Sequence, residues 1–382
     1  MKQKKLFGKI ALLLALAMLF AFPADVIYAK SSKTISLSKL SKSRVLTLKN
    51  MPSASIYSIL KTYKGKKLKT HTIQNFSYTP DLKYIFTVGE CNTGSKKHTL
   101  LTVSKINKEF GDKNTSTCID ARVLGNYGHG DAIAITERDS SKEIYDIWVA
   151  SDAGSNGFGR CIDRMTIAIE NEKMVIKKKV RIKNFKKANV INGKAALFEE
   201  KEAPKRMNVA ADEKNNQIVF RSETSTEINY LAYDLKKLNK ALDKKKDGAK
   251  YDIAKQAKNQ KANVRCNVVP KSVFQSFRVA DNTIYICGGY FNDGAEINTI
   301  KYKVYNNGKS VQQDKKFSDN VSKVINLPST IKIGKRSFNK KNVEVEGMDF
   351  VRNEKGKIDV HINYYARGVD VRNGITIFRF GL

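Results

Sequence analysis

The sequence is poor in cysteine and histidine. Its 382 residues include five cysteines and four histidines. Five cysteines are too few for a small fold that depends on disulfides. None of the histidines stands at ligand spacing from a cysteine, so we expect no metal site and no cofactor. In an exported chain two disulfides could still form, and the sequence-local pairs are Cys91–Cys118 and Cys266–Cys287. The alternative is that all five thiols stay free.

Long apolar runs are also scarce. The one unbroken run, Ile10 to Phe22, follows four lysines and precedes a small residue, Ala29. It is shorter than the roughly 20 residues that span a bilayer. This pattern predicts a secretory signal peptide over residues 1–29 and a mature chain that begins near Lys30. No second apolar span or wall-sorting tail follows, so we expect a released, extracellular protein.

Acidic residues are few relative to basic ones. The chain has 37 Asp and Glu against 70 Lys and Arg, a net charge of +33. Residues 1–29 hold four lysines and one aspartate, so the expected mature chain carries +30. Such an excess implies an anionic partner: teichoic acid, phospholipid headgroups or nucleic acid. Aromatic residues do not alternate with the cations, and the protein is expected outside the cell, so a nucleic-acid partner is disfavoured. The alternative is that the charge only maintains solubility.

One pattern recurs five times along the chain. A short strand with a polar residue is followed by Asp or Asn in a turn and then by a strongly apolar strand, as in 274–281 and 283–287. Each copy has room for four strands, and a four-stranded sheet repeated around an axis is a β-propeller. We therefore predict an all-β, five-bladed propeller of antiparallel blades over residues 30–382, with segment 33–60 closing the last blade. The alternative is a two-domain β-sandwich, which the unequal repeat spacing favours.

A basic segment, residues 235–261, interrupts the pattern. Leu235, Leu238 and Leu242 stand at helical spacing, with ten lysines against three aspartates from Leu235 to Lys261. This predicts an amphipathic helical insert. It could contact a membrane surface or a polyanion. The favoured interpretation is a solvated helix laid across the third blade, because three leucines offer little area for insertion.

Inner propeller strands line a central channel, so the aligned polar residues should converge there. The predicted ring is a ligand-binding site for a sugar or polyol phosphate, and a solvated channel without ligand is the alternative. Its members are Gln74, His129, Asn208, Gln275 and Glu346, with Asp131 beside His129.

Other residues carry weaker signals. Tyr364, Tyr365 and Arg367 are predicted at the surface for sugar stacking, and Trp148 is predicted to pack between blades. Glycoside hydrolysis requires two carboxylates around one bond, whereas the aligned ring offers only Glu346, so we assign no catalytic residue. The run 152–163 resembles a calcium loop, but Gly154 occupies a ligand position and a plain strand connection is favoured.

The repeats resemble a known family, the helveticin J-like class III bacteriocins. They are also similar to the five-bladed propellers of teichoic-acid-related proteins and of some phage receptor-binding proteins. The resemblance implies a secreted antibacterial protein that acts on the envelope of Gram-positive cells, with no catalytic residues to carry over. The high lysine content and the insert near Leu235 depart from that family. The matching segments are Phe274-Gln-Ser-Phe277, Gly128-His-Gly130, Trp148-Val-Ala-Ser151, Val345-Glu-Gly347 and Ile375-Thr-Ile-Phe-Arg-Phe380.

These observations lead to one principal hypothesis and two rivals. The principal hypothesis is a non-enzymatic, monomeric, cationic propeller that binds an anionic cell-wall polymer or glycan. The first rival is an extracellular hydrolase of glycans or phosphoesters that uses Glu346, Asp131 and His129. The second is a lectin or adhesin that does not kill cells.

Overall fold

The structure is a computed structural model of the chain. The residues it describes belong to one unit, Ser31–Leu382. The predicted signal peptide, residues 1–29, lies outside the described residues, as does most of segment 33–60. The described ranges are 34–36, 44–49, 62–107, 115–198, 202–267, 269–306, 309, 311–315, 321–327, 330–333, 336–352, 356–367 and 376–381.

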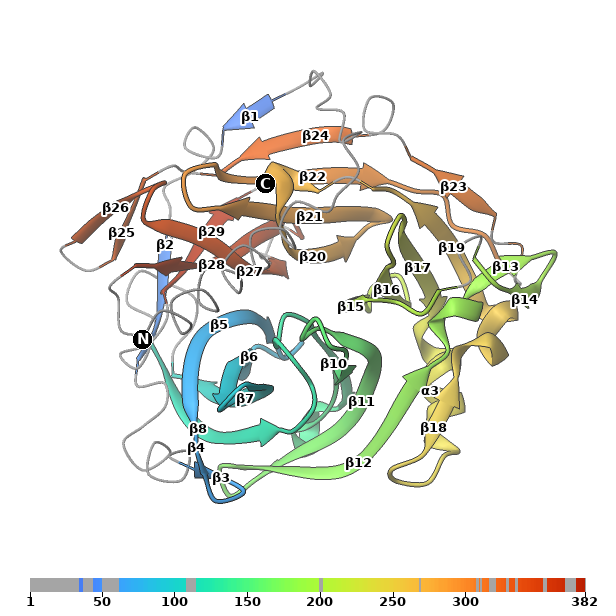
Figure 1. Ribbon diagram of the computed structural model, residues 1–382, viewed down its shortest axis with the longest axis horizontal. Coiled ribbons are helices and arrows are strands. Elements are labelled where there is room, and N and C mark those ends of the chain that lie inside the picture. The colour runs from blue at the N-terminus through green and yellow to red at the C-terminus, as the bar shows by residue number, and fades with distance from the viewer. Residues whose placement is uncertain are drawn as a thin grey trace, which may run out of the picture. The chain divides into compact units, whose positions relative to one another are not determined.

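Five blades surround a common axis, which confirms the predicted propeller and excludes the sandwich (Figure 1). The innermost strands β5, β9, β15, β20 and β27 contact one another in a closed cycle. From inner to outer strand, the blades are β5 (Lys69–Tyr78), β6 (Tyr84–Thr93), β7 (Lys96–Ile106) and β8 (Thr115–Leu124); β9 (Ile133–Asp139), β10 (Ile144–Ala153), β11 (Gly159–Glu170) and β12 (Lys173–Lys183); β15 (Arg206–Asp212), β16 (Gln217–Glu223), β17 (Ile228–Asp234) and β19 (Gln260–Arg265); β20 (Phe274–Ala280), β21 (Thr283–Tyr290), β22 (Gly294–Lys301) and β24 (Val321–Asn326); and β27 (Val343–Arg352), β28 (Ile358–Ala366), β29 (Thr376–Gly381) and β2 (Arg44–Lys49).

The turn residues account for the tight hairpins within the blades. Asp281 and Asn282, which join β20 to β21, have φ angles of 49° and 57°. Two consecutive positive φ angles define the type I′ turn, whose twist matches that of paired strands, and Asn and Asp tolerate this conformation. The recurring Asp or Asn of the sequence pattern therefore marks this inner hairpin.

Hydrophobic packing lies between the blades. Each blade is sandwiched by two neighbours, so strands such as β10 are buried on both faces over most of their length. Five apolar clusters fill the five interfaces between neighbouring blades. Trp148 lies in the cluster between blades 2 and 3, fully buried, with its ring centroid 6.3 Å from that of Phe220. Its predicted role in packing between blades is confirmed.

The N-terminal part of the unit reaches two blades. Strand β2 pairs antiparallel with β29 and so supplies the fourth strand of blade 5. Strand β1 (Thr34–Ser36) instead pairs with β24, the outer strand of blade 4. Residues from both ends of the unit therefore share blade 5.

A short parallel ladder joins most neighbouring blades at their outer edges. The segment that leads into the outer strand of one blade pairs with the outer strand of the preceding blade, over three residue pairs in each case. This occurs at four of the five interfaces, through β18 (Lys250–Asp252) on β12, β23 (Gln312–Asp314) on β19, β1 on β24, and the start of β8 on β2. These ladders occupy the exposed edges that propeller blades otherwise leave open.

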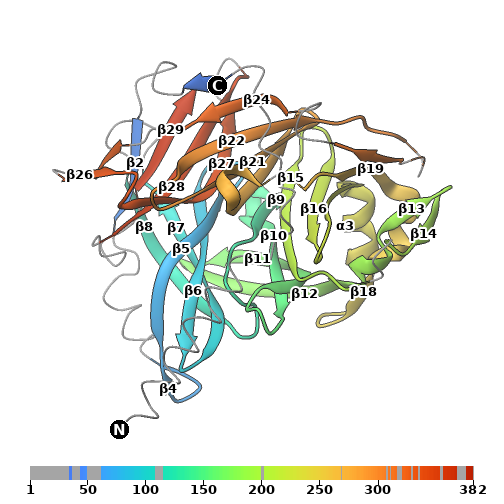
Figure 2. The same ribbon diagram turned by 45° about the horizontal axis from the view of Figure 1, so that its top comes forward.

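Smaller elements decorate the blades. Helix α3 (Leu235–Asp243) and the 3-10 helix η4 (Ile253–Asn259) lie within the basic insert, so the predicted helix is confirmed but is shorter than the segment 235–261. Figure 2 shows the hairpin of β3 (Thr62–Tyr63) and β4 (Lys66–Lys67) at one end of blade 1. The remaining elements are the hairpins β13 (Asn189–Ile191) with β14 (Lys194–Ala196) and β25 (Thr330–Ile333) with β26 (Arg336–Asn339), and the 3-10 helices η2 (Ser140–Lys142), η3 (Phe185–Lys187) and η5 (Pro270–Ser272).

All five cysteines are buried free thiols. Neither of the two sequence-local disulfides forms. The thiols lie within apolar clusters or next to them, where burial raises the pKa of Cys91 to about 12 and that of Cys161 to about 11. They therefore act as small apolar side chains.

Candidate functional site

Three of the five predicted ring residues occupy the same structural position. Gln74, Gln275 and Glu346 are each skipped where the register of an inner strand shifts against its neighbour. Each is thus the extra residue of a β-bulge, which redirects side chains locally. The backbone therefore supports the alignment of these three copies. However, the predicted residue falls outside the regular pairing of the strand, and the residue after it takes the paired position.

The side chain of Asn75, from blade 1, binds groups of blades 2 and 4 near the axis. Its Nδ2 donates to the backbone oxygen of Asp131 in blade 2 at 2.9 Å and to Ser276 Oγ in blade 4 at 3.2 Å. Its Oδ1 accepts from Arg278 Nη2 at 3.4 Å. Only 2% of Asn75 is exposed. The meeting point of the blades is therefore a closed polar plug at this level.

Arg278 extends the plug toward blade 5. Its Nε donates to Asp349 Oδ1 at 2.9 Å and its Nη2 donates to the backbone oxygen of Phe76 at 2.5 Å. The other oxygen of Asp349 accepts from the backbone N–H of Tyr78 at 2.8 Å. This buried ion pair is fully hydrogen-bonded, as a buried charge must be.

Asp131 and Asn208 meet as predicted, and both belong to the plug. Asn208 Nδ2 donates to Asp131 Oδ2 at 3.0 Å, and Arg206 Nε donates to the same oxygen at 2.5 Å. Burial favours the neutral acid, but the charges of Arg206 and His129 and the hydrogen bonds from Asn208 and Arg206 together lower the pKa of Asp131. The Nδ1 of His129 itself lies 2.5 Å from Glu90 Oε2. The side chain of Asp131 is therefore engaged in holding blades 2 and 3 together.

Glu346 and Glu344 form an acidic pair beside Gln275. Burial, followed by the charge of Glu344, raises the pKa of Glu346 well above its usual value. Burial also raises the pKa of Glu344 to about 7, although Gln275 Nε2 donates to its Oε1 at 2.6 Å and Arg367 opposes the shift. The surroundings of Glu346 therefore favour its neutral form, and those of Asp131 favour its ionised form.

The predicted stacking residues do not form one surface. Tyr364 is 4% exposed and packs edge-on against Phe378, so its prediction as a surface residue is wrong. The cause is the alternation of side chains along β28, which points Tyr364 into the core between blades 4 and 5. Tyr365 is half-buried, and Arg367 is exposed with its guanidinium 4.0 Å from the ring centroid of Phe291.

The predicted calcium loop has other partners. Both carboxylate oxygens of Asp163 accept from Arg181, and Oδ1 also accepts from Ser151 at 2.6 Å. Within the described ranges, no three His, Cys, Asp or Glu side chains gather as metal ligands. Residues 154–158 connect β10 to β11, and the rest of the segment 152–163 lies in these two strands.

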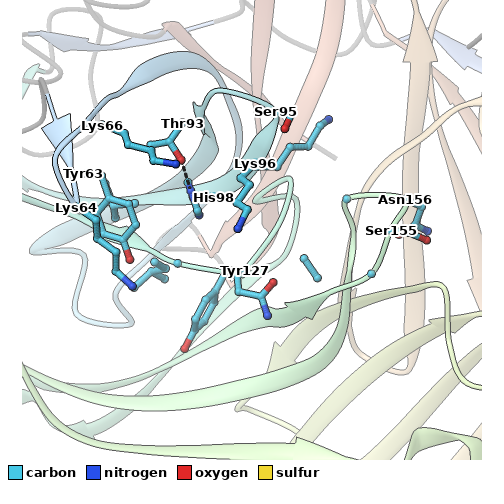
Figure 3. Close-up of a pocket in the computed structure, with 18 of the residues that line it drawn as sticks. Tyr63, Lys64, Lys66, Thr93, Ser95, Lys96, His98, Tyr127, Ser155 and Asn156 are labelled. Atoms are coloured by element: carbon cyan, nitrogen blue, oxygen red, sulfur yellow. Dashed lines mark hydrogen bonds between the residues drawn. The ribbon is translucent and has the colours of Figure 1, made fainter. Parts of the chain in front are cut away.

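A pocket lies between blades 1 and 2 (Figure 3). We call it the interblade pocket. Its volume is about 850 Å³. Its walls come from the hairpin β3–β4, the turn between β6 and β7 with the strand ends beside it, the end of β8, the loop between β10 and β11, and residues of β11 and β12. Separate segments of two blades therefore form one concavity.

The interblade pocket is strongly cationic. Its lining contains five lysines and no Asp or Glu: Lys64, Lys66, Lys96, Lys97 and Lys179. Within the described part of the chain, only Lys97 among them is paired with a carboxylate, Glu90 Oε2, at 2.9 Å. Hydroxyl and amide groups of Thr93, Ser95, Ser155 and Asn156 also face the pocket (Figure 3).

His98 supplies an unused polar atom in the wall of this pocket. It is 8% exposed, and its Nε2 lies 2.8 Å from Thr93 Oγ1. Its Nδ1 is buried with no hydrogen-bond partner among the described residues. Burial, then the charges of Lys64 and Lys96, lower the pKa of His98, so the ring is neutral. A buried polar atom without a partner costs free energy that a bound group could recover.

Sequence reasoning missed the interblade pocket. Two local signals were present: lysines around Gly65, and Lys96-Lys97-His98 after Gly94-Ser95. Both are basic turns next to strands of the first copy. Their convergence with the loop around Gly157 depends on the contact between two blades, which no local pattern reveals.

The apolar face of the basic insert points inward. Leu238 and Leu242 are fully buried and Leu235 is 5% exposed, all within the cluster between blades 2 and 3. The idea that these leucines contact a membrane is therefore wrong, because the core already covers them. No helix in the described ranges is long and apolar enough to cross a membrane.

Comparisons with known proteins give only distant similarities. No family model matches the sequence, and no curated protein matches it. Solved structures similar to this chain include a hypothetical protein from Leishmania major, with 10% identity and a TM-score of 0.40 over 90% of this chain and 91% of that one. TolB from Acinetobacter baumannii has 9% identity and a TM-score of 0.30, over 81% of this chain and 54% of its own. A GH43 β-1,3-galactosidase has 9% identity and a TM-score of 0.34, over 82% of this chain and 60% of its own. We transfer no residue role from these proteins.

Proposed function

We propose that the protein is an exported, non-enzymatic propeller that binds an anionic cell-wall polymer in the interblade pocket. The observation that carries this proposal is the pocket lining, which has five lysines and no carboxylate. Five like charges around one concavity repel one another, and an anionic ligand relieves that repulsion. Phosphate groups fit the lysines, while the hydroxyl and amide groups suit a polyol or sugar between the phosphates.

The net charge of the chain supports the same partner. At +33, the protein attracts polyanions over long range and raises the rate of encounter. Attraction of this kind weakens as salt screens the charges. The resemblance to helveticin J-like proteins further suggests the walls of Gram-positive cells as the target. Whether binding leads to killing separates a bacteriocin from an adhesin, and a growth-inhibition assay on Gram-positive cells distinguishes them.

Sedimentation with purified walls tests the proposal. The mature protein should sediment with Gram-positive walls at low salt, and much less with walls stripped of teichoic acid. The pocket variant Lys64→Gln/Lys66→Gln/Lys96→Gln should lose most of this binding. Equal sedimentation with intact and stripped walls would reject the polyanion as the partner.

A matched control separates the pocket from net charge. Lys301, Lys340 and Lys341 are exposed, lie outside every pocket described above and form no ion pair among the described residues. The variant Lys301→Gln/Lys340→Gln/Lys341→Gln removes the same charge from blades 4 and 5. If it weakens wall binding as much as the pocket variant, then general charge and not the pocket carries the interaction.

A second candidate function is hydrolysis at the axis. The observation that favours it is that the pKa is raised at Glu346 and lowered at Asp131, because one neutral acid and one ionised base can share a reaction. Both side chains are buried, so this function also requires the plug to open to substrate. Glu346→Gln and His129→Ala should then abolish turnover and leave wall binding intact. If the unmutated protein degrades no wall polymer, this function is rejected.

A further inference from the structure

The basic insert holds a second concavity, between α3 and η4. Its volume is about 350 Å³, and we call it the lysine hollow. Five of its nine lining residues are lysines, and none is acidic: Lys237, Lys240, Lys244, Lys245 and Lys255, with Ala241, Tyr251, Gln256 and Asn259. It lies on the outside of blades 2 and 3 and shares no lining residue with the interblade pocket.

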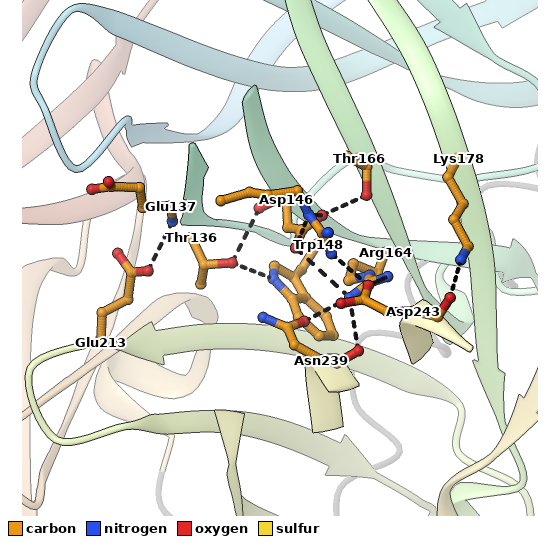
Figure 4. A network of polar contacts seen from close by, with 11 residues as sticks. Thr136, Glu137, Asp146, Trp148, Arg164, Thr166, Lys178, Glu213, Asn239 and Asp243 are labelled. Atoms are coloured by element: carbon orange, nitrogen blue, oxygen red, sulfur yellow. Dashed lines mark hydrogen bonds and ion pairs between the residues drawn. The ribbon is translucent and has the colours of Figure 1, made fainter. Parts of the chain in front are cut away.

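The acidic residues of the insert point away from this hollow. Asp243 accepts from Arg164 Nη2 at 2.7 Å and from Arg138 Nη2 at 2.5 Å, both from blade 2 (Figure 4). Asp247 accepts from the backbone N–H of Lys179 at 2.8 Å, and Asp252 accepts from Asn184 Nδ2 at 2.9 Å. All three carboxylates between residues 235 and 261 therefore bind groups of blade 2 or Asn184, the residue that directly follows its last strand.

The lysines of the hollow have no such partners. Among the described residues none of the five forms an ion pair, and the one cation–ring contact places Lys245 Nζ 5.7 Å from the centroid of Tyr251. Lys237 and Lys240 lie three residues apart on α3, and Lys244, the residue that caps its C-terminus, lies four residues after Lys240. Like charges at such spacings repel one another and destabilise a helix. The helix therefore carries a repulsion that a bound anion would remove.

The backbone that carries the hollow is held in place. Arg164 is 1% exposed, and besides binding Asp243 its Nη1 donates to Asn239 Oδ1 at 2.8 Å. Three leucines fix the opposite face of α3 in the core. A backbone that is already fixed loses less conformational entropy when the site binds a ligand.

We propose that the lysine hollow is a phosphate-binding site for a flexible phosphate polymer, separate from the interblade pocket. A polymer fits better than a lipid surface, because the site is concave and the leucines of α3 are buried under it. A chain that occupies both sites gains effective concentration for the second contact. The hollow and the interblade pocket use different residues, so either proposal can fail alone.

Calorimetric titration of the mature protein with long-chain inorganic polyphosphate tests the inference. The hollow variant Lys240→Gln/Lys244→Gln/Lys255→Gln should bind roughly tenfold more weakly than the unmutated protein at low salt. The loss should persist in a protein that also carries the three pocket substitutions, which shows that the hollow binds polyphosphate without the interblade pocket. The control is Lys301→Gln/Lys340→Gln/Lys341→Gln, with the same change of charge. Equal affinities of hollow and control variants would overturn the proposal.

Two further measurements complete the test. In the unmutated protein, polyphosphate should protect Lys240 and Lys244 from amine acetylation, read by mass spectrometry, and leave Lys301 unprotected. Equal labelling with and without polyphosphate would contradict the site without any mutation. Anionic phospholipid vesicles serve as the second probe. If the hollow variant loses vesicle binding but keeps its affinity for polyphosphate, the partner is a lipid surface and the polymer assignment is wrong.

Discussion

Replacing Asn75 by alanine tests the register of the axial plug. The change removes the bonds to the Asp131 backbone and to Ser276, the bond from Arg278, and the 2.9 Å bond that Oδ1 accepts from the backbone N–H of Phe76. At about 0.5–1.5 kcal/mol for each, and allowing for the weak 3.4 Å contact, we expect a loss of roughly 2–4 kcal/mol in the free energy of unfolding. Urea denaturation of the mature protein measures it.

The neighbouring residue provides the matched control. Gln74 is half-buried, and its side chain makes no hydrogen bond among the described residues. Gln74→Ala should therefore change the free energy of unfolding by no more than about 0.5 kcal/mol. If Gln74→Ala lowers the free energy of unfolding as much as Asn75→Ala does, the bulge is not where we place it, and Gln74 faces the axis instead.

Three further predictions follow from buried groups. Trp148 is the sole tryptophan and donates through Nε1 to Thr136 Oγ1 at 3.1 Å, so its fluorescence should be blue-shifted when folded, and Trp148→Phe should destabilise the fold by about 1–3 kcal/mol in denaturation. A thiol reagent should titrate all five cysteines after unfolding and almost none before, and a lower total would reveal a disulfide. Glu344 has a folded pKa of about 7 against an unfolded value near 4.5, so its contribution to stability is present at acid pH and is lost as the pH rises through 7. Glu344→Gln should therefore flatten the fall in stability between pH 5 and pH 8, and an unchanged fall would contradict the assignment.

The blade architecture could be predicted because it rests on local patterns. Each copy places an Asp or Asn turn between a polar-bearing strand and an apolar one, and the hairpin at Asp281-Asn282 is built in that way. The uneven spacing, which favoured a sandwich, has a simple cause. The hairpin β13–β14 is inserted between blades 2 and 3, where the spacing is longest.

The side chains at the axis could not be predicted in the same way. A single extra residue in a strand moves the following side chains to the opposite face. The bulges at Gln74, Gln275 and Glu346 do this in three inner strands. The alternation of apolar residues in the sequence does not indicate where these bulges lie. The inner strands were therefore identified correctly, while Asn75 and Ser276 were overlooked.

The interblade pocket and the lysine hollow depend on contacts between distant segments. The leucine spacing of the insert predicted a helix, but the ties from Asp243 to Arg138 and Arg164 join residues about 80 to 100 positions apart. These ion pairs determine where the insert lies against blade 2 and which of its lysines have no carboxylate partner among the described residues. The sequence alone indicates the excess of lysine, and the fold determines where unpaired lysines gather.

The salt dependence of binding tests the central claim most directly. Dissociation constants of the mature protein for purified teichoic acid, measured across a series of salt concentrations, give a slope that counts the cations in contact with the polymer. For Lys64→Gln/Lys96→Gln we predict weaker binding and a slope shallower by about 1.5 units, because two contacts are lost. A slope and an affinity equal to those of Lys301→Gln/Lys340→Gln would contradict binding at the interblade pocket.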